Sequence, residues 1–333
     1  MLTENLPRVP IAHLPTPLEE MPRLSEALGG PRLFVKRDDQ TGLATGGNKA
    51  RKLEFLVADA LEKGADTIIT AGAVQSNHAR QTAAAAAVTS CDGNGFGLRC
   101  CLVLGGQSPK HWNGNLLLDE LLGADIRWAG ERDRAQMMEE VAEEMMRLGR
   151  RPYIIPVGGS NPVGSAGYVE AMVELMGQLE ERDLQLDRVV FPTGSGGTQA
   201  GMMVGAKALG FAGRIEGVSV SPTKDVLRPK LEELVADTAT FLGLDLSFAS
   251  EDFIVHDDYL GEGYAKIGPP EREAIRLAAR TEGLLVGPVY TGRALAGLID
   301  LIRRGVVGPD ETVLFWHTGG TPALFAYADE LLY

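Results

Sequence analysis

The segment TGGNKARK, at residues 45–52, places a lysine at the start of a predicted helix. Lys49 follows two glycines and Asn48, and apolar residues recur directly after it. We therefore expect a loop that leads into a helix, with Asn48 as the N-cap and Lys49 in the first turn. An ammonium group there faces the positive end of the helix dipole, which favours loss of its proton. Lysines with a depressed pKa form Schiff bases with carbonyl compounds. A solvated lysine at a helix start is the competing interpretation, and the loops further along the chain argue against it.

A run of small residues, TGSGGTQAG at 193–201, follows a predicted strand and opens a predicted helix. Such a loop allows several backbone amides to point at one anion, and the hydroxyls of Ser195 and Thr198 add donors. Gln199 stands where a dinucleotide fingerprint needs glycine, and the chain has no Walker sequence. The run therefore favours a cradle for one phosphate monoester over a merely tight turn. The predicted cradle consists of Gly194, Ser195, Gly196, Gly197 and Thr198.

Three other loops carry polar residues near predicted strand ends. In QSNH, at residues 75–78, Ser76 and Asn77 are placed to meet a carboxylate at a helix N-terminus, although simple N-capping explains them equally well. His78 is a candidate base, but it falls inside the following helix. The segments PVYTG (288–292) and HTGG (317–320) repeat the arrangement with Tyr290, Thr291 and Thr318.

Composition limits the function classes. The chain has 333 residues and a net charge of -13, which argues against nucleic-acid or anionic-membrane partners. Its three cysteines, Cys91, Cys100 and Cys101, suggest reduced thiols and a cytoplasmic location, and no spacing suits a metal site. The N-terminus lacks the apolar run of a signal peptide, and no apolar stretch is long enough to span a bilayer.

Strand and helix patterns alternate along the chain, which predicts an α/β fold with mainly parallel sheets. Ligands of such sheets bind beyond the carboxyl ends of the strands, so we expect the loops above to converge on one cleft. The expected strands include 32–37, 67–71, 100–104, 188–192, 284–286 and 312–316. We expect a small domain, 51–160, inserted into a larger domain formed by 1–50 and 161–333.

Several motifs in this order resemble the D-cysteine desulfhydrase and 1-aminocyclopropane-1-carboxylate (ACC) deaminase family. They are GGNKARKLEFL, GAVQSNHARQTAAAAA, GNLLLDELLGA, TGSGGTQAG, PVYTGRALAGLIDLI and HTGG, and the likeness extends from about residue 8 to 331. The resemblance implies homodimeric enzymes that use pyridoxal phosphate. It also implies fold type II, the tryptophan-synthase-β-like fold, with two three-layer αβα domains and the active site in the cleft between them.

The resemblance also implies roles for individual residues. Lys49 would be joined covalently to the cofactor, and residues 194–198 would hold its phosphate. Asn77 would contact the 3′ oxygen of the pyridine ring. Ser76 and its neighbours Gln75, Asn77 and His78 would bind the substrate carboxylate. Tyr264 and Tyr290 would lie near the reacting carbons, and Lys49 or Ser76 would remove the α-proton.

Two positions favour one branch of this family. In ACC deaminases the last two motifs look like PVYEG and HLGG. This chain has Thr291 in place of the glutamate and Thr318 in place of the leucine, as the desulfhydrase branch does. A neutral hydroxyl beside the pyridine nitrogen makes the ring a weaker electron sink, which suits β-elimination better than opening of a cyclopropane. The expected reaction converts D-cysteine to pyruvate, ammonia and hydrogen sulfide.

Three alternatives remain open: an L-cysteate sulfo-lyase that releases sulfite, an ACC deaminase, and an inactive amino-acid-binding protein of the same fold. The intact Lys49 and phosphate loop argue against the last of these. Residues 90–100 form a longer segment than the family pattern leads us to expect, and Lys110 and His111 are expected to face solvent.

Overall fold

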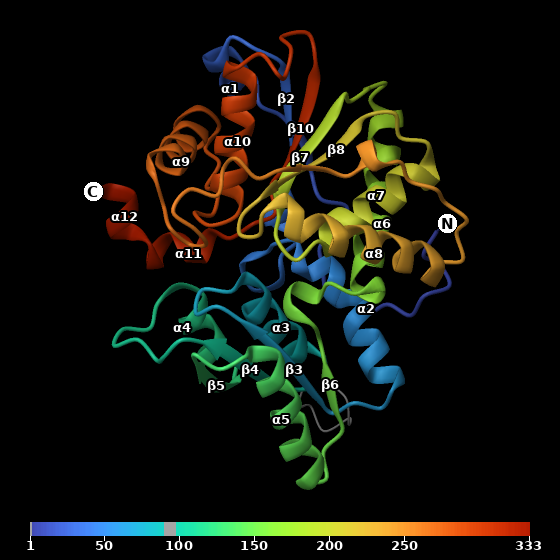
Figure 1. Ribbon diagram of the computed structural model, residues 1–333, viewed down its shortest axis with the longest axis vertical. Coiled ribbons are helices and arrows are strands. Elements are labelled where there is room, and N and C mark those ends of the chain that lie inside the picture. The colour runs from blue at the N-terminus through green and yellow to red at the C-terminus, as the bar shows by residue number, and fades with distance from the viewer. Residues whose placement is uncertain (1, 90–97) are drawn as a thin grey trace.

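The computed structural model describes residues 2–89 and 98–333, which form two lobes, each built on its own sheet (Figure 1). The unusually long segment noted at 90–100 therefore lies mostly outside the described residues. Within the described part, every strand pair is parallel except β1 with β2. The predicted α/β class with mainly parallel sheets is confirmed.

The larger sheet has the strand order β1-β2-β10-β7-β8-β9. Its strands are β1 (Leu18–Glu20), β2 (Arg32–Lys36), β7 (Arg188–Thr193), β8 (Arg214–Ser219), β9 (Ile254–His256) and β10 (Thr312–Trp316). One face packs against α1 (Pro22–Leu28), α9 (Pro269–Glu282) and α10 (Thr291–Arg303). The other face packs against α6 (Pro162–Glu181), α7 (Gly197–Leu209) and α8 (Lys224–Phe241). The chain ends in α11 (Thr321–Ala326) and α12 (Ala328–Leu332).

The smaller sheet has the order β5-β4-β3-β6. Its strands are β3 (Thr67–Gly72), β4 (Arg99–Gly105), β5 (Asp125–Gly130) and β6 (Pro152–Ile154). One face is covered by α2 (Lys49–Glu62), α3 (Asn77–Val88) and α4 (Gly114–Leu121), and the other by α5 (Arg134–Arg147). These strands all fall inside 51–160, and the strands of the larger sheet all fall outside it. The domain bounds themselves stay a prediction.

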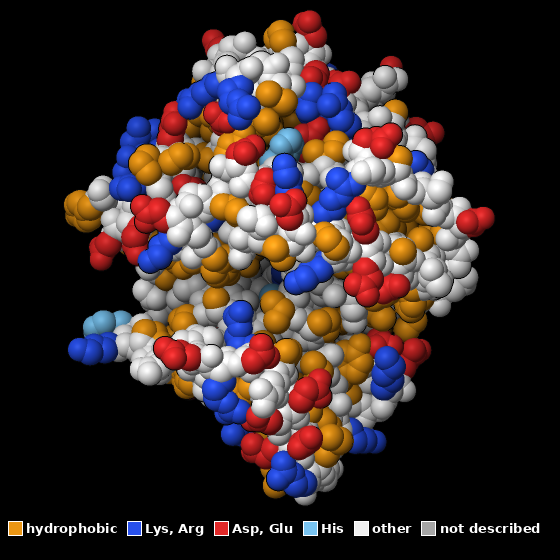
Figure 2. All heavy atoms as spheres, in the orientation of Figure 1, with side chains coloured by type: hydrophobic (Ala, Val, Ile, Leu, Met, Phe, Trp, Pro, Cys, Tyr) orange, Lys and Arg blue, Asp and Glu red, His pale blue; other side chains and the backbone are white. Residues whose placement is uncertain are grey.

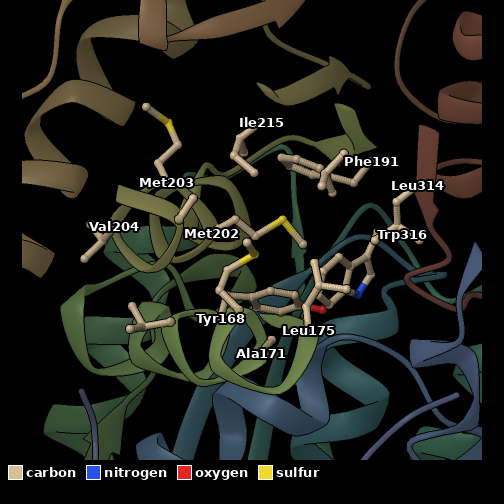
Figure 3. Packing of buried hydrophobic residues seen from close by; sticks show 14 of the residues in the cluster. Tyr168, Ala171, Leu175, Phe191, Met202, Met203, Val204, Ile215, Leu314 and Trp316 are labelled. Carbon is tan, nitrogen blue, oxygen red and sulfur yellow. The ribbon is translucent and has the colours of Figure 1, made fainter. Parts of the chain in front are cut away.

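The core of the larger lobe shows why both faces of its sheet are covered. Val189 and Phe191 of β7 point to one face of the sheet, and Val190, between them in the sequence, points to the other face. Because parallel strands are buried on both sides, they read as continuous apolar runs. Figure 3 shows one of these layers, in which Tyr168 of α6 meets Trp316 of β10 edge to face at 5.8 Å between ring centroids.

The structure corrects three expectations about elements. Residues 284–286 are not a strand: Leu284 and Val286 pack into the core, but the backbone of this segment pairs with no strand of either sheet. The sequence pattern at 321–331 predicts a single last helix, but the structure divides this segment at Tyr327 into α11 and α12. The antiparallel edge strand β1 was not predicted, because its three residues are too short to show a pattern.

Within residues 2–89 and 98–333, no helix has the length and apolarity needed to cross a membrane. Over the same residues, no cluster of His, Cys, Asp and Glu could hold a metal ion. Cys100 and Cys101 are free and buried.

Candidate active site

A cleft of about 340 Å³ opens between the two lobes, where Figure 2 shows a hollow in the surface. It is lined by the start of α2 and by the loops that follow β3, β7, β8 and β10. These loops leave the carboxyl ends of parallel strands, as expected for a ligand site in an α/β fold. The predicted convergence of the glycine-rich loops on one cleft is therefore confirmed.

Lys49 is the first residue of α2 and lines the cleft. Burial lowers the pKa of its amine to about 8. Asn48 holds the N-cap position as predicted, but its side chain does not cap the helix; it donates to Thr198 Oγ1 at 3.1 Å. Gln81 Oε1 accepts the Lys49 backbone N–H at 3.0 Å and thereby anchors the turn. The loop also requires glycine at residue 46, where φ is +70° and a Cβ atom would lie 1.9 Å from a backbone oxygen.

A buried ionic network fixes α2 one turn further along. Arg51 donates from Nε and Nη2 to the two carboxylate oxygens of Asp38, each at 2.9 Å, and from Nη1 to Glu174 at 2.9 Å. Asp38 follows β2 and Glu174 lies on α6, so the network ties the helix that carries Lys49 to the larger sheet. Removing one partner of such a buried ion pair is strongly destabilising. The network therefore fixes the position of the helix that carries Lys49.

The predicted phosphate cradle lies at the N-terminus of α7. Gly194, Ser195, Gly196 and Thr198 line the cleft, and Gly196 adopts a left-handed conformation at the N-cap. Gly197 follows Gly196 and does not line the cleft; a Cβ atom on Gly197 would lie 2.6 Å from Lys52 Nζ. A helix N-terminus flanked by small residues is a site for an anion.

Lys52 lies behind the predicted cradle and was not among the predicted site residues. Its side chain is buried, and Nζ donates to the Gly158 carbonyl at 3.0 Å. Ser160 lies 3.4 Å from the same Nζ and bonds Ser195 through their hydroxyls at 2.7 Å. No carboxylate pairs with Lys52 within the described chain. Burial, with the charge of Lys49 as the next cause, holds the pKa of Lys52 well below its usual value. A phosphate dianion would supply the missing counter-charge.

The segment 75–78 presents the N-terminus of α3 to the cleft. Ser76 accepts the Ala79 backbone N–H at 3.1 Å, so it is an N-cap and also lines the cleft, which reconciles the two interpretations of its sequence. Gln75 points away instead: its side chain bonds Asn113 and the backbone N–H of Asn115.

Asn77 is oriented by a residue that sequence reasoning missed. The Asn115 side chain donates to Asn77 Oδ1 at 2.9 Å and to the Gln75 carbonyl at 3.0 Å. Because this bond uses the Asn77 oxygen, the Asn77 amide nitrogen is the group left to donate into the cleft. No local signal marks Asn115, since it lies on α4 and reaches Asn77 only through the tertiary fold.

His78 lines the cleft as a neutral imidazole. Burial, with the charges of Lys49 and Lys52 next, holds its pKa well below the ordinary value. Thr70 donates its hydroxyl proton to a backbone carbonyl at 2.8 Å, so it accepts from His78 Nε2 at 3.0 Å. The Nδ1 lone pair of His78 is therefore free, and it has no partner among the described residues.

Tyr264 and Tyr290 meet on the larger-lobe side of the cleft. Their hydroxyls lie 3.0 Å apart and their rings pack edge to face. Burial raises the pKa of both phenols, and the charge of Arg134, which lines the cleft from the smaller lobe, partly opposes this rise. Arg293 holds the Tyr264 loop by donating to the Gly263 carbonyl at 3.0 Å.

The two threonines are placed differently. Thr318 lines the cleft. Thr291 is fully buried beside it, and its hydroxyl lies 3.1 Å from the carbonyl oxygens of both Gly287 and Gly319. Its single proton is thus directed at backbone carbonyls, which leaves only an oxygen lone pair for a ligand.

Comparison with known proteins identifies the family. The sequence model of the family described as "Pyridoxal-phosphate dependent enzyme" matches residues 9–319. The chain therefore belongs to the pyridoxal-phosphate-dependent enzymes, and pyridoxal phosphate is its cofactor.

Its relatives narrow this class. The D-cysteine desulfhydrase of Klebsiella pneumoniae subsp. pneumoniae is 45% identical over 340 residues, covering 99% of this chain and 100% of the relative. The D-cysteine desulfhydrase of Klebsiella pneumoniae strain 342 is 44% identical with the same coverage. A solved structure described as an ACC deaminase homologue superposes with a TM-score of 0.90 at 41% identity, covering 99% of this chain and 97% of that one. The resemblance and the fold type drawn from the motifs are confirmed.

The residues present fit this cofactor. The cleft-lining residues, all in the described part of the chain, include no Asp or Glu, while Lys49 lines the cleft and Lys52 lies directly behind the α7 N-terminus. An anionic cofactor with an aldehyde would therefore meet an amine of lowered pKa at Lys49 and a buried lysine without a counter-ion at Lys52.

Proposed function

We propose that this protein is a β-elimination lyase that converts D-cysteine and water to pyruvate, ammonia and hydrogen sulfide. The observation that carries the proposal is the identity of 44–45% along the whole chain with proteins named D-cysteine desulfhydrase. Thr291 and Thr318 support it, since both offer a neutral oxygen where a carboxylate would favour ACC deamination.

The cofactor would be held by four parts of the site. Lys52, the Ser195 hydroxyl and the amides at the α7 N-terminus would bind its phosphate, and Lys49 would bind its aldehyde carbon. Asn77 would donate to the ring oxygen from the amide nitrogen that Asn115 leaves free. Thr291 and Thr318 at the ring nitrogen stay a prediction. When bound, pyridoxal phosphate withdraws electron density from the α carbon of an amino acid.

The remaining groups would act on the substrate. Ser76 and the first amides of α3 would bind the α-carboxylate at a helix N-terminus, with neutral His78 beside them. The amine of Lys49, whose pKa is about 8, is partly unprotonated near neutral pH and would take the α-proton. Tyr264 and Tyr290 would contact the β-substituent, and their shared hydrogen bond leaves one phenolic proton to donate to the departing sulfur.

The test is the release of pyruvate and sulfide from D-cysteine by the holoenzyme. We expect equal amounts of both products, and none from Lys49→Ala, whose cofactor would be held only non-covalently. L-Cysteate and ACC are the comparison substrates, measured through sulfite and 2-oxobutyrate. A preference for either of them over D-cysteine would replace the proposal by the corresponding alternative, and inertness toward all three would indicate a binding protein.

We further propose that the protein is a homodimer. Leu121 of α4 and Phe325 of α11 are each 72% exposed, on helices that pack against each other. Large apolar side chains exposed on two packed helices are candidates for a protein–protein interface. Sedimentation equilibrium should give twice the chain mass of 35.6 kDa, and Leu121→Glu with Phe325→Glu should give the monomer.

A cytoplasmic location is also proposed, because Cys100 and Cys101 are free thiols on a buried strand. Disulfides are rare in the reducing cytoplasm, where such thiols persist. Cell fractionation with an antibody to the chain would test the location.

A further inference from the structure

The charge of the cleft is opposite to that of the whole protein. The chain carries a net charge of -13, yet its cleft is lined by Lys49 and Arg134 and, within the described residues, by no carboxylate. A third cation, Lys52, lies directly behind the lining. Such a site favours ligands with several negative charges.

The ligands already assigned leave one of these cations unused. Under the proposed function, Lys52 and the α7 N-terminus meet the cofactor phosphate, and Lys49 meets its aldehyde. The α-carboxylate of the substrate meets the N-terminus of α3. Arg134 has no partner in this scheme.

Arg134 is held in position by the fold. It is the first residue of α5, directly after Asp133, which caps that helix. Backbone hydrogen bonds of 3.1 and 2.9 Å between Gly106 and Gly130 bring the start of this segment against the end of β4. The Arg134 side chain packs over the end of β4, since a Cβ atom on Gly105 would lie 3.5 Å from Arg134 Cδ, in ordinary van der Waals contact.

The guanidinium of Arg134 is free to bind a ligand. Within the described residues it forms no ion pair or hydrogen bond, because Asp133 is occupied as a cap and Glu140 pairs with Arg132. Across the cleft it faces Tyr264 and Tyr290, whose pKa values respond to its charge.

We propose that Arg134, together with the Tyr264–Tyr290 hydroxyl pair, binds a second negative charge on the side chain of the substrate. The cleft then binds an amino acid with an anionic β-substituent more tightly than a neutral one of similar size. The thiolate form of D-cysteine is such a substrate, and a β-carboxylate is a stable probe of the same charge. Guanidinium pairs with a carboxylate through two N–H donors, and a phenol adds a further donor. The assignment rests on the proposed function, because that function places the other cations.

The test is calorimetric titration of the holoenzyme with aspartate and with 2-aminobutyrate, each as both enantiomers. Aspartate carries a β-carboxylate, and 2-aminobutyrate is its neutral counterpart of similar size. We expect wild type to bind one aspartate enantiomer about 10- to 100-fold more tightly than the matching 2-aminobutyrate, the range for charge-assisted hydrogen bonds. Arg134→Gln should abolish this preference, Arg134→Lys should keep part of it, and Arg147→Gln, at the opposite end of α5, should keep all of it.

Two outcomes would overturn the proposal. Equal weakening of aspartate and 2-aminobutyrate in Arg134→Gln would assign the arginine to the α-carboxylate. Unchanged binding of both would show that Arg134 is only solvated. Because neither ligand has to be turned over, a failure to release sulfide from D-cysteine leaves this titration interpretable.

Discussion

Replacing Lys52 by methionine should weaken cofactor binding and stabilise the protein that lacks the cofactor. Methionine keeps most of the side-chain volume but removes a buried ammonium that pairs with no carboxylate in the described chain. Truncating one partner of a buried, hydrogen-bonded charge pair costs about 2–5 kcal/mol. The α7 amides and Ser195 remain to bind the phosphate, so we expect the lower part of that range. At about 2–3 kcal/mol, the Kd for pyridoxal phosphate rises roughly 30- to 150-fold.

The stability effect has the opposite sign because the lysine is costly when no anion is present. Burial depresses the pKa of Lys52 in the folded state, so the unfolded chain binds more protons and stability rises with pH up to the unfolded pKa. Lys52→Met removes this dependence, and the cofactor-free variant should unfold at higher urea concentration than wild type at neutral pH.

The measurements are a fluorescence titration of the cofactor-free protein with pyridoxal phosphate and a urea unfolding curve of the same sample. Lys36→Met is the matched control, since Lys36 is equally buried but pairs with Glu174. That variant should lose stability, because Glu174 loses its partner, and should bind the cofactor normally once folded. Unchanged affinity in Lys52→Met, or a loss of stability without cofactor, would refute the assignment of Lys52 to the phosphate.

Three further substitutions test other parts of the site. Asn115→Ala frees Asn77 to rotate and should weaken cofactor binding about tenfold in the same titration, whereas Asn113→Ala should not. Asp119→Asn tests a buried carboxyl whose pKa burial raises to about 8. The folded protein then retains a proton that the unfolded chain loses above pH ~4, so wild-type stability falls as pH rises from about 4 to 8. Urea unfolding at both ends of this range should show a smaller fall for Asp119→Asn. Gly197→Ala puts a Cβ atom 2.6 Å from Lys52 Nζ and should lower cofactor affinity, while Gly177→Ala, which has open space, should not.

The parts of the site that were predicted from sequence are those encoded within one loop. The glycine-rich run at 193–201 and the lysine at a helix start each combine a strand, a turn and a helix N-terminus within a few residues, so local rules locate them. The same rules could also have pointed to Lys52. It lies three residues after Lys49 and hence on the same face of α2.

The parts that were missed depend on packing between distant segments. Asn115 contacts Asn77 from α4, and Arg134 reaches the cleft from α5, on opposite faces of the smaller sheet, and nothing in their sequence neighbours marks them. The false strand at 284–286 has the same origin. Leu284 and Val286 are buried and Leu285 is exposed, the alternation of a strand, but the backbone of this segment pairs with no strand of the described sheets.

The site also explains how the cofactor contributes to folding. Without it, Lys49 and Lys52 lie one helical turn apart in a buried region with no carboxylate beside Lys52, an arrangement that disfavours the folded state. The Arg51 network holds α2 in place against this repulsion, because it attaches the next residues of the same helix to Asp38 and Glu174. A ligand that binds only the folded chain adds stability in proportion to the logarithm of its concentration over Kd. Under the proposed assignment of Lys52 to the phosphate, the same unpaired cation that weakens the empty protein would make the loaded protein dependent on, and selective for, a phosphorylated cofactor.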